Sequence, residues 1–154
     1  MVKSLEEFAG WLRFIQAVNW VLIIFGVFGI GFLVFLVIRD IAGLPVAIFI
    51  IIDLIVTIYL TFKIIKLLKE RSSESPNKII MLFLWILAAT VICVVLEWLM
   101  SLIFQIPSYL NVSSKMAIKL VGRPLIPFLF CSAYFKQSKR VKAYYGSNAS
   151  LSFL

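Results

Sequence analysis

The stretch 14-FIQAVNWVLIIFGVFGIGFLVFLVI-38 decides the fold class of this chain. It contains no Asp, Glu, Lys or Arg, and it is longer than the roughly 20 apolar residues that a helix needs to cross a bilayer. It follows an acidic start, Glu6 and Glu7, and no small-residue cleavage site comes after a short apolar core. We therefore interpret it as a retained membrane span and not as a signal peptide.

The whole chain has the composition of an integral membrane protein. Of its 154 residues, 63% are hydrophobic and 14% are charged, whereas soluble domains are about 45–50% apolar and about 25% charged. Further apolar segments lie at about 44–62, 79–106 and 116–135. We predict an all-α integral membrane protein with four transmembrane helices in a compact bundle, forming a single membrane domain over 1–154.

The residues before the first span are predicted to form a helix at the membrane interface, over 1–13. Ser4 followed by Glu7 fits the capping box that starts helices. Leu5, Phe8 and Trp11 then share one apolar face, which such a helix would bury in the interface. The alternative is that these residues simply extend the first span.

Lysine and arginine are distributed unevenly between the two sides of the predicted membrane. The side that holds both termini carries Lys3, Arg13, Lys63, Lys66, Lys69, Arg71, Lys78, Lys136, Lys139, Arg140 and Lys142. The opposite side carries Arg39 and Lys115, with Lys119 and Arg123 if those face outward. Because cytoplasmic segments hold the excess of Lys and Arg, we predict that both termini are cytoplasmic and that 136–154 is a basic cytoplasmic tail.

The segment at 116–135 is the least regular of the four predicted spans. To reach the length of a membrane span it must include Lys119 and Arg123. Pro124 and Pro127 each remove one hydrogen bond from the helix that contains them. We therefore expect this helix to be kinked or broken around Arg123.

Polar groups inside the predicted spans are the candidate functional residues, because a charge in the hydrocarbon core is costly unless it is paired or hydrated. Asp53 lies near mid-membrane, with Thr57 one turn away. A polar stripe on one face of the third span consists of Thr90, Cys93, Glu97, Ser101 and Gln105. We hypothesise that Arg123 pairs with Glu97 or Asp53 and ties the fourth helix to the second and third. Lys119, one turn further out, would reach the lipid headgroups.

Two interpretations of this intramembrane network remain open. In the first, acids and bases satisfy one another inside the bundle and the network is purely structural. In the second, the same residues form a functional polar pocket on the path of an ion or a substrate.

The residue types that the chain lacks exclude several classes of protein. There is no histidine, which removes His-ligated haem, most zinc sites and Ser-His or Cys-His nucleophile pairs. Both cysteines lie inside apolar segments, which indicates packing and not a disulfide framework.

The net charge of +8 arises mostly at the ends of apolar segments, so we expect anionic lipid headgroups as the counter-charge and no nucleic acid. We expect no catalytic residues, no metal and no cofactor.

Motifs near the two ends of the chain resemble one family. Gly10-Trp11-Leu12 precedes the first span, and Arg123 is followed by Tyr134-Phe135-x-x-Ser138-Lys139-Arg140-Val141-Lys142. This arrangement resembles a group of small bacterial inner-membrane proteins known as domain of unknown function 2569, which are of similar size and have four predicted spans. Where that family usually continues with a Thr-Phe pair, this chain has Ala143-Tyr144-Tyr145. The resemblance implies a multi-pass protein of the bacterial cytoplasmic (inner) membrane, and it implies no activity.

Two functional hypotheses follow. The first is a non-enzymatic accessory or interaction subunit that acts through helix packing, with a membrane-protein partner or as a homo-oligomer. Its basic cluster, predicted to dock anionic lipids or an acidic partner, consists of Lys136, Lys139, Arg140 and Lys142. The second is a small oligomeric transporter or channel that uses Asp53, Glu97 and Arg123. Whether the two carboxylates face water or a dry, paired interior distinguishes these hypotheses.

Overall fold

Four long helices and one short helix make up the part of the chain that the structure describes, which comprises residues 10–39, 44–103 and 114–146 of a computed structural model. The helices are α1 (Trp11–Arg39), α2 (Leu44–Lys69), α3 (Ser75–Ile103), α4 (Ser114–Gln137) and α5 (Lys139–Tyr145). The prediction of an all-helical protein is confirmed for these residues.

Three of the helices are long and apolar enough to cross a membrane: α1, most of α2 (Ala47–Lys69) and most of α3 (Ser75–Met100). Three such helices in one chain indicate a multi-pass membrane protein. The prediction of four spans is thus confirmed only in part, because α4 does not meet the same criterion within the described ranges. Helix α4 is also less apolar than the other three long helices, with Lys115, Lys119 and Arg123 in its first half.

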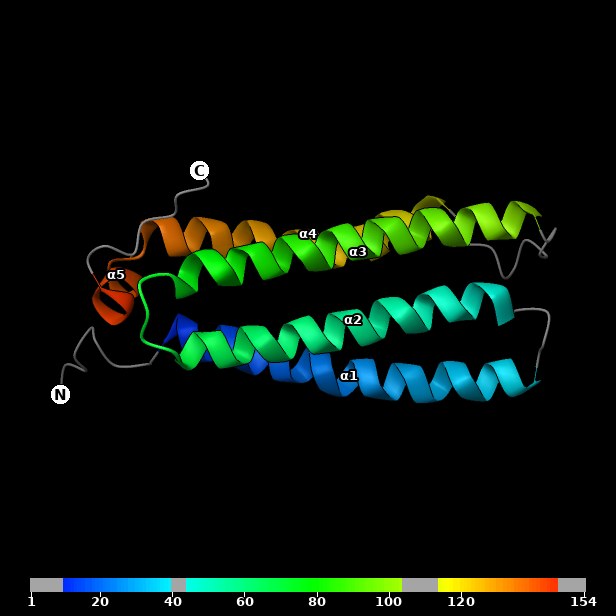
Figure 1. Cartoon of the computed structure of the whole chain (residues 1–154), viewed down its shortest axis with the longest axis horizontal. Coiled ribbons are helices and arrows are strands. Elements are labelled where there is room, and N and C mark those ends of the chain that lie inside the picture. The colour runs from blue at the N-terminus through cyan, green and yellow to red at the C-terminus, as the bar shows by residue number, and fades with distance from the viewer. Residues whose placement is uncertain (1–9, 40–43, 104–113, 147–154) are drawn as a thin grey trace.

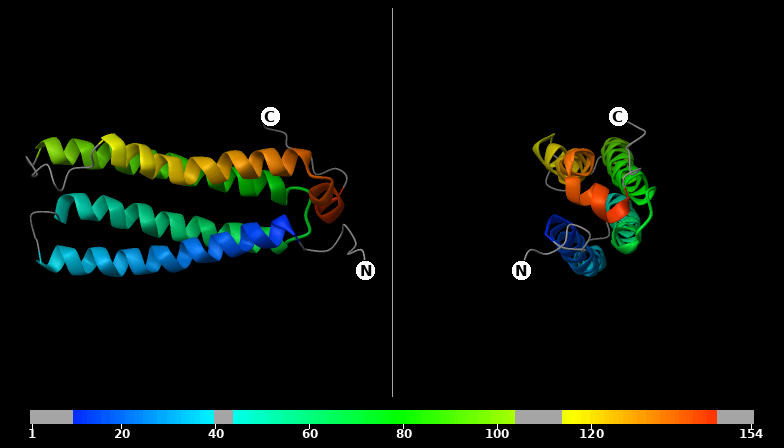
Figure 2. Two further views of the ribbon diagram at one scale, coloured as in Figure 1. Left: turned by 180° about the vertical axis from the view of Figure 1, so that it is seen from behind. Right: turned by 90° about the vertical axis from the view of Figure 1, so that its left-hand side faces the viewer.

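The four long helices run antiparallel to one another in chain order, and each packs against the next (Figure 1). The beginning of α1, the turn between α2 and α3, and the end of α4 all lie at one end of the bundle (Figure 1). The short helix α5 lies across this end (Figure 2). We call it the basic end because Lys63, Lys66, Lys69, Lys136 and Lys142 belong to the helix segments that meet there.

The packed apolar core lies at the basic end and draws on all five helices. It consists of Leu12, Ile15, Ile64, Leu68, Ile79, Ile80, Phe83, Ile86, Cys131, Phe135, Val141, Tyr144 and Tyr145. Farther from the basic end many large apolar side chains are exposed, as on Phe28, Phe32 and Trp98. Exposed apolar side chains on a membrane helix are in place for contact with lipid tails, whereas the basic end closes around its own core.

Helix α5 was not predicted from the sequence, which indicated only a basic tail after Phe135. The helix begins after Ser138, whose hydroxyl accepts a hydrogen bond from the backbone N–H of Val141 at 3.4 Å. This is the usual role of serine at a helix N-cap. Val141 and Tyr145 on α5 are buried against the bundle. Residues 139–145 of the predicted basic tail therefore form a helix, and residues 147–154 lie outside the described part of the chain.

The structure bears on two further predictions, the break in the fourth helix and the separate helix before the first span. The fourth helix is not broken: α4 runs without interruption from Ser114 to Gln137, with Pro124 and Pro127 inside it. A neighbouring helix compensates for lost backbone hydrogen bonds in such segments, and α3 packs against α4.

At the other end of the chain α1 begins at Trp11, directly after Gly10 with φ of 60°, so residues 11–13 extend the first span. The rest of the predicted interfacial helix lies outside the described residues.

Candidate functional site

The two intramembrane carboxylates lie at the interface of α2 and α3. Asp53 is on α2, ten residues before Lys63, which puts it about 15 Å along the helix from that lysine. The hydroxyl of Thr90 on α3 donates a hydrogen bond of 2.9 Å to Asp53 Oδ1. This contact connects two residues that are 37 positions apart in the chain, and it joins Asp53 to the polar stripe of α3.

Glu97 is two helical turns from Thr90 on the same face of α3, with Cys93 between them. Its side chain is only 3% exposed. Within the described part of the chain its Oε2 atom has no hydrogen-bond partner. Asp53 contacts this same face of α3 at Thr90, about two helical turns from Glu97. Thr90, Cys93 and Glu97 are all buried, so this part of the stripe faces the interior of the bundle.

The expected ion pair with Arg123 is not formed. Arg123 is exposed on α4, and among the residues described here no ion pair joins it to Asp53 or Glu97. The reason lies in the packing of α4, which turns Pro124 inward and leaves Arg123 on the outer side of the helix. Sequence spacing places a residue on a face, but it does not say which face a neighbouring helix will cover.

The remaining residues of the predicted network contribute less to this arrangement. Thr57, one turn after Asp53, is partly buried. The side chains of Lys119 and Ser101 lie outside those that the structure describes, and so does the whole of Gln105. The site is therefore defined by Asp53, Thr90 and Glu97. Thr90 stood in the predicted stripe, but only the structure brings it to Asp53.

The site holds two acidic groups and no basic group within the described ranges. Two neighbouring carboxylates that are both charged repel one another, and the repulsion is strong where water is excluded. The polar stripe is flanked by apolar side chains such as Val91 and Val94. A counter-charge from outside the site, or a proton on one carboxyl group, would remove this repulsion. In residues 10–39, 44–103 and 114–146 no group of three or more His, Cys, Asp and Glu side chains is placed to hold a metal ion.

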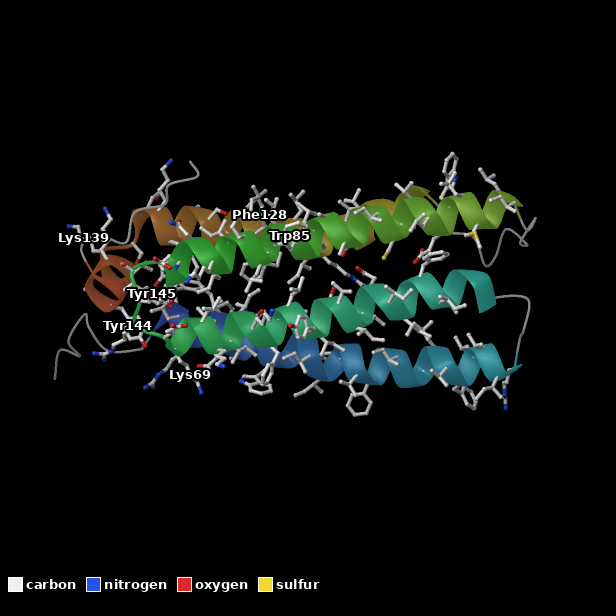
Figure 3. The ribbon with its side chains drawn as sticks, viewed as in Figure 1. Lys69, Trp85, Phe128, Lys139, Tyr144 and Tyr145 are labelled. Carbon is white, nitrogen blue, oxygen red and sulfur yellow. The ribbon has the colours of Figure 1, made fainter. Side chains whose placement is uncertain are left out.

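The predicted basic cluster lies at the junction of α4 and α5. Lys136, Lys139 and Lys142 are exposed, whereas the side chain of Arg140 is outside those described. Figure 3 shows Lys139 pointing away from the bundle at this end. The far end of α5 contains two residues to which the sequence analysis gave no role. Tyr144 and Tyr145 lie against the end of α2 near Lys69 (Figure 3).

Comparison with known proteins adds no relative to this description. No protein-family model matches the chain, and no curated protein or solved structure matches it.

Proposed function

We propose that this protein is a small non-enzymatic membrane protein that takes up and releases a proton at Asp53 and Glu97, as a small transporter or channel. The observation that supports this proposal is a pair of carboxyl groups, a buried Glu97 and a half-buried Asp53, with no ion pair to a basic side chain in the described part of the chain. Glu97 is almost completely buried, and its Oε2 atom lacks a hydrogen-bond partner among the described residues. Adding one proton removes the repulsion between the two groups and supplies a hydrogen-bond donor.

A proton suits this site better than a bulkier counter-charge. The Asp53 carboxylate is already joined to Thr90, and Glu97 is covered by its neighbours. A metal ion needs several ligand atoms at fixed distances, and a basic side chain from another protein needs room to enter. A proton needs neither, and intramembrane Asp and Glu residues serve as proton relays in pumps and transporters.

The proposal includes a fourth crossing of the membrane by α4. Its 24 residues correspond to about 36 Å of helix, which exceeds the roughly 30 Å of a bilayer core. It runs beside α3 back to the basic end (Figure 1). With four crossings the basic end faces one compartment, and its many lysines favour the cytoplasm. The resemblance at Gly10-Trp11-Leu12 and Tyr134-Phe135 supports the inner membrane of a bacterium as the location.

The protonation of the pair can be measured directly by infrared spectroscopy of the purified protein. We expect the C=O stretching band of a protonated carboxylic acid at neutral pH, and we expect Glu97→Gln or Asp53→Asn to remove or shift it. Glu70→Gln is the matched control, because Glu70 is exposed after the end of α2. Absence of the band in the unaltered protein at neutral pH would disprove the protonated pair.

Transport is tested separately with protein in liposomes that contain a pH-sensitive dye. After an acid pulse outside, the unaltered protein should acidify the lumen faster than empty liposomes do. Glu97→Gln should abolish the difference, and Glu70→Gln should preserve it. A rate equal to that of empty liposomes under both polarities of the gradient would count against conduction of protons by this chain alone.

A second candidate function, an accessory or interaction subunit, is favoured by the surface of α1. From residue 27 to residue 39 no side chain of α1 is buried, and Phe28 and Phe32 are exposed. This half of α1 offers an apolar face to a partner helix. Gentle solubilisation from native membranes should then yield a second membrane protein in fixed stoichiometry, and the pair Phe28→Ala and Phe32→Ala should release it. Purification of the chain without a partner would remove this candidate.

A further inference from the structure

A groove at the basic end of the bundle lies between α2 and α3, away from the carboxylate pair. Its volume is about 430 Å³. It is lined by Lys63, Leu67, Asn77, Lys78, Met81, Leu82 and Trp85. The two cations come from the last turns of α2 and the first turn of α3, where these helices would leave the membrane.

The groove changes in character with depth. Lys78 stands in the first turn of α3, whereas Trp85 is seven residues further along, about 10 Å deeper in the bundle. Figure 3 shows Trp85 farther from the basic end than Lys69 and Tyr145. Between these two levels the wall is formed by Met81 and Leu82. Lys78 lies near the rim, and Lys63, six residues before the end of α2, lies about as deep as Leu82. Cations beside an apolar wall match a molecule with an anionic head and a hydrocarbon tail.

The two lysines are placed differently in the structure. Lys63 is exposed, and its ammonium group lies 4.5 Å from the centre of the Tyr59 ring. Lys78 forms an ion pair of 2.7 Å with Glu74, and both of these side chains are largely exposed. Exposed pairs of this kind are weak, so a phosphate can displace Glu74 from Lys78.

We propose that this groove binds one phospholipid with an anionic headgroup. The phosphate group lies between the ammonium groups of Lys63 and Lys78, and one acyl chain lies along Met81, Leu82 and Trp85. The charge of the rim argues for an anionic head, since each lysine near a lipid surface favours an anionic headgroup. This site is separate from the exposed lysines of α4 and α5, which are Lys136, Lys139 and Lys142.

The test is native mass spectrometry of the detergent-purified protein titrated with phosphatidylglycerol, and with phosphatidylcholine of the same acyl chains. We expect one phosphatidylglycerol to bind more tightly than the rest and more tightly than phosphatidylcholine. The double variant Lys63→Ala with Lys78→Ala should weaken this binding by about 25-fold, from about fivefold for each lysine. The charge-preserving double variant Lys63→Arg with Lys78→Arg should retain it and should show that the fold is intact.

A matched double variant on the other basic surface separates the two sites. Lys136→Ala with Lys139→Ala removes the same number of charges but leaves the groove untouched, so it should retain the tightly bound lipid. Three results would overturn the proposal. They are equal binding of the two lipids, unchanged binding by the groove variant, and an equal loss in both double variants, which would indicate attraction by net charge alone.

Discussion

The hydroxyl group of Tyr145 donates a hydrogen bond of 2.9 Å to the carbonyl oxygen of Leu68, 77 residues earlier in the chain. The hydroxyl of the adjacent Tyr144 donates one of 3.2 Å to the carbonyl of Lys69. Both acceptors are in the last turn of α2, where backbone carbonyls have no partner within the helix. Helix α5 therefore caps α2.

Removing one hydroxyl group tests this cap. Tyr145→Phe keeps the ring but leaves the Leu68 carbonyl without its donor in a buried position. We expect a loss of about 1–3 kcal/mol in the free energy of unfolding, the usual cost of a buried unsatisfied group. Thermal unfolding in detergent measures it. Tyr59→Phe is the control, because Tyr59 is exposed and its ring is retained. Equal stability of the two variants would show that the cap contributes nothing.

The same residue predicts a dependence on alkaline pH. Burial raises the pKa of Tyr145 above its ordinary value of 10.0, with smaller contributions from Tyr144 and Tyr134. The docked state thus favours the neutral phenol. Its stabilisation is complete below pH 10 and is lost progressively as pH rises above that value.

Thermal unfolding of the unaltered protein and of Tyr145→Phe, measured from pH 8 to about pH 12, checks this prediction. The stability difference between the two proteins should shrink above pH 10, since the phenylalanine variant has no group to ionise at that position. A difference that stays constant over the whole range would contradict it.

The close approach of α1 and α2 depends on one glycine. A Cβ atom at Gly26 would lie 3.0 Å from Ile58 Cγ1 and 3.1 Å from Ile58 Cδ1, whereas one at Gly31 would meet nothing within 4 Å. We expect Gly26→Leu to separate the helices and to lower the free energy of unfolding by about 1–3 kcal/mol. Gly31→Leu should leave it unchanged. The two variants can be compared by unfolding in detergent, and the prediction fails if Gly31→Leu is as destabilising as Gly26→Leu.

Arg123 provides a prediction of no effect. Because it is exposed and forms no ion pair with Asp53 or Glu97 in the described part of the chain, Arg123→Ala should change the free energy of unfolding by less than about 0.5 kcal/mol. The infrared band of the carboxyl pair should also stay in place. A loss of several kcal/mol would instead indicate that the arginine is paired with a buried carboxylate.

The long helices could be predicted from the sequence because a membrane leaves few alternatives. The apolar segments at 14–38, 44–62 and 79–106 correspond to α1, α2 and α3, which begin or end a few residues away from those limits. In lipid a backbone must satisfy its own hydrogen bonds, so a long apolar run has to be helical. The same reasoning placed Glu97 on an interior face of α3, since its polar stripe has helical spacing.

Other parts could not be predicted, because they depend on which surfaces meet. Helix α5 has only seven residues and is rich in basic side chains, so the sequence contains no apolar run that would predict it. Its Val141, Tyr144 and Tyr145 become buried only because the ends of several helices converge around them. Likewise the sequence offered Arg123 as the counter-charge for Glu97, although the packing of α4 turns it outward.

The sequence by itself thus determined the helical class, the number of long apolar segments and the concentration of positive charge at one end. These features follow from local composition, because the transfer of apolar and charged groups between water and lipid acts on each segment separately. Only the tertiary structure decided that Thr90 contacts Asp53, that Glu97 is buried with no hydrogen-bond partner for Oε2 among the described residues, and that the tyrosines of α5 cap α2. Those features require segments that are distant in the chain to pack together, and the periodicity of one helix does not specify its neighbour's face.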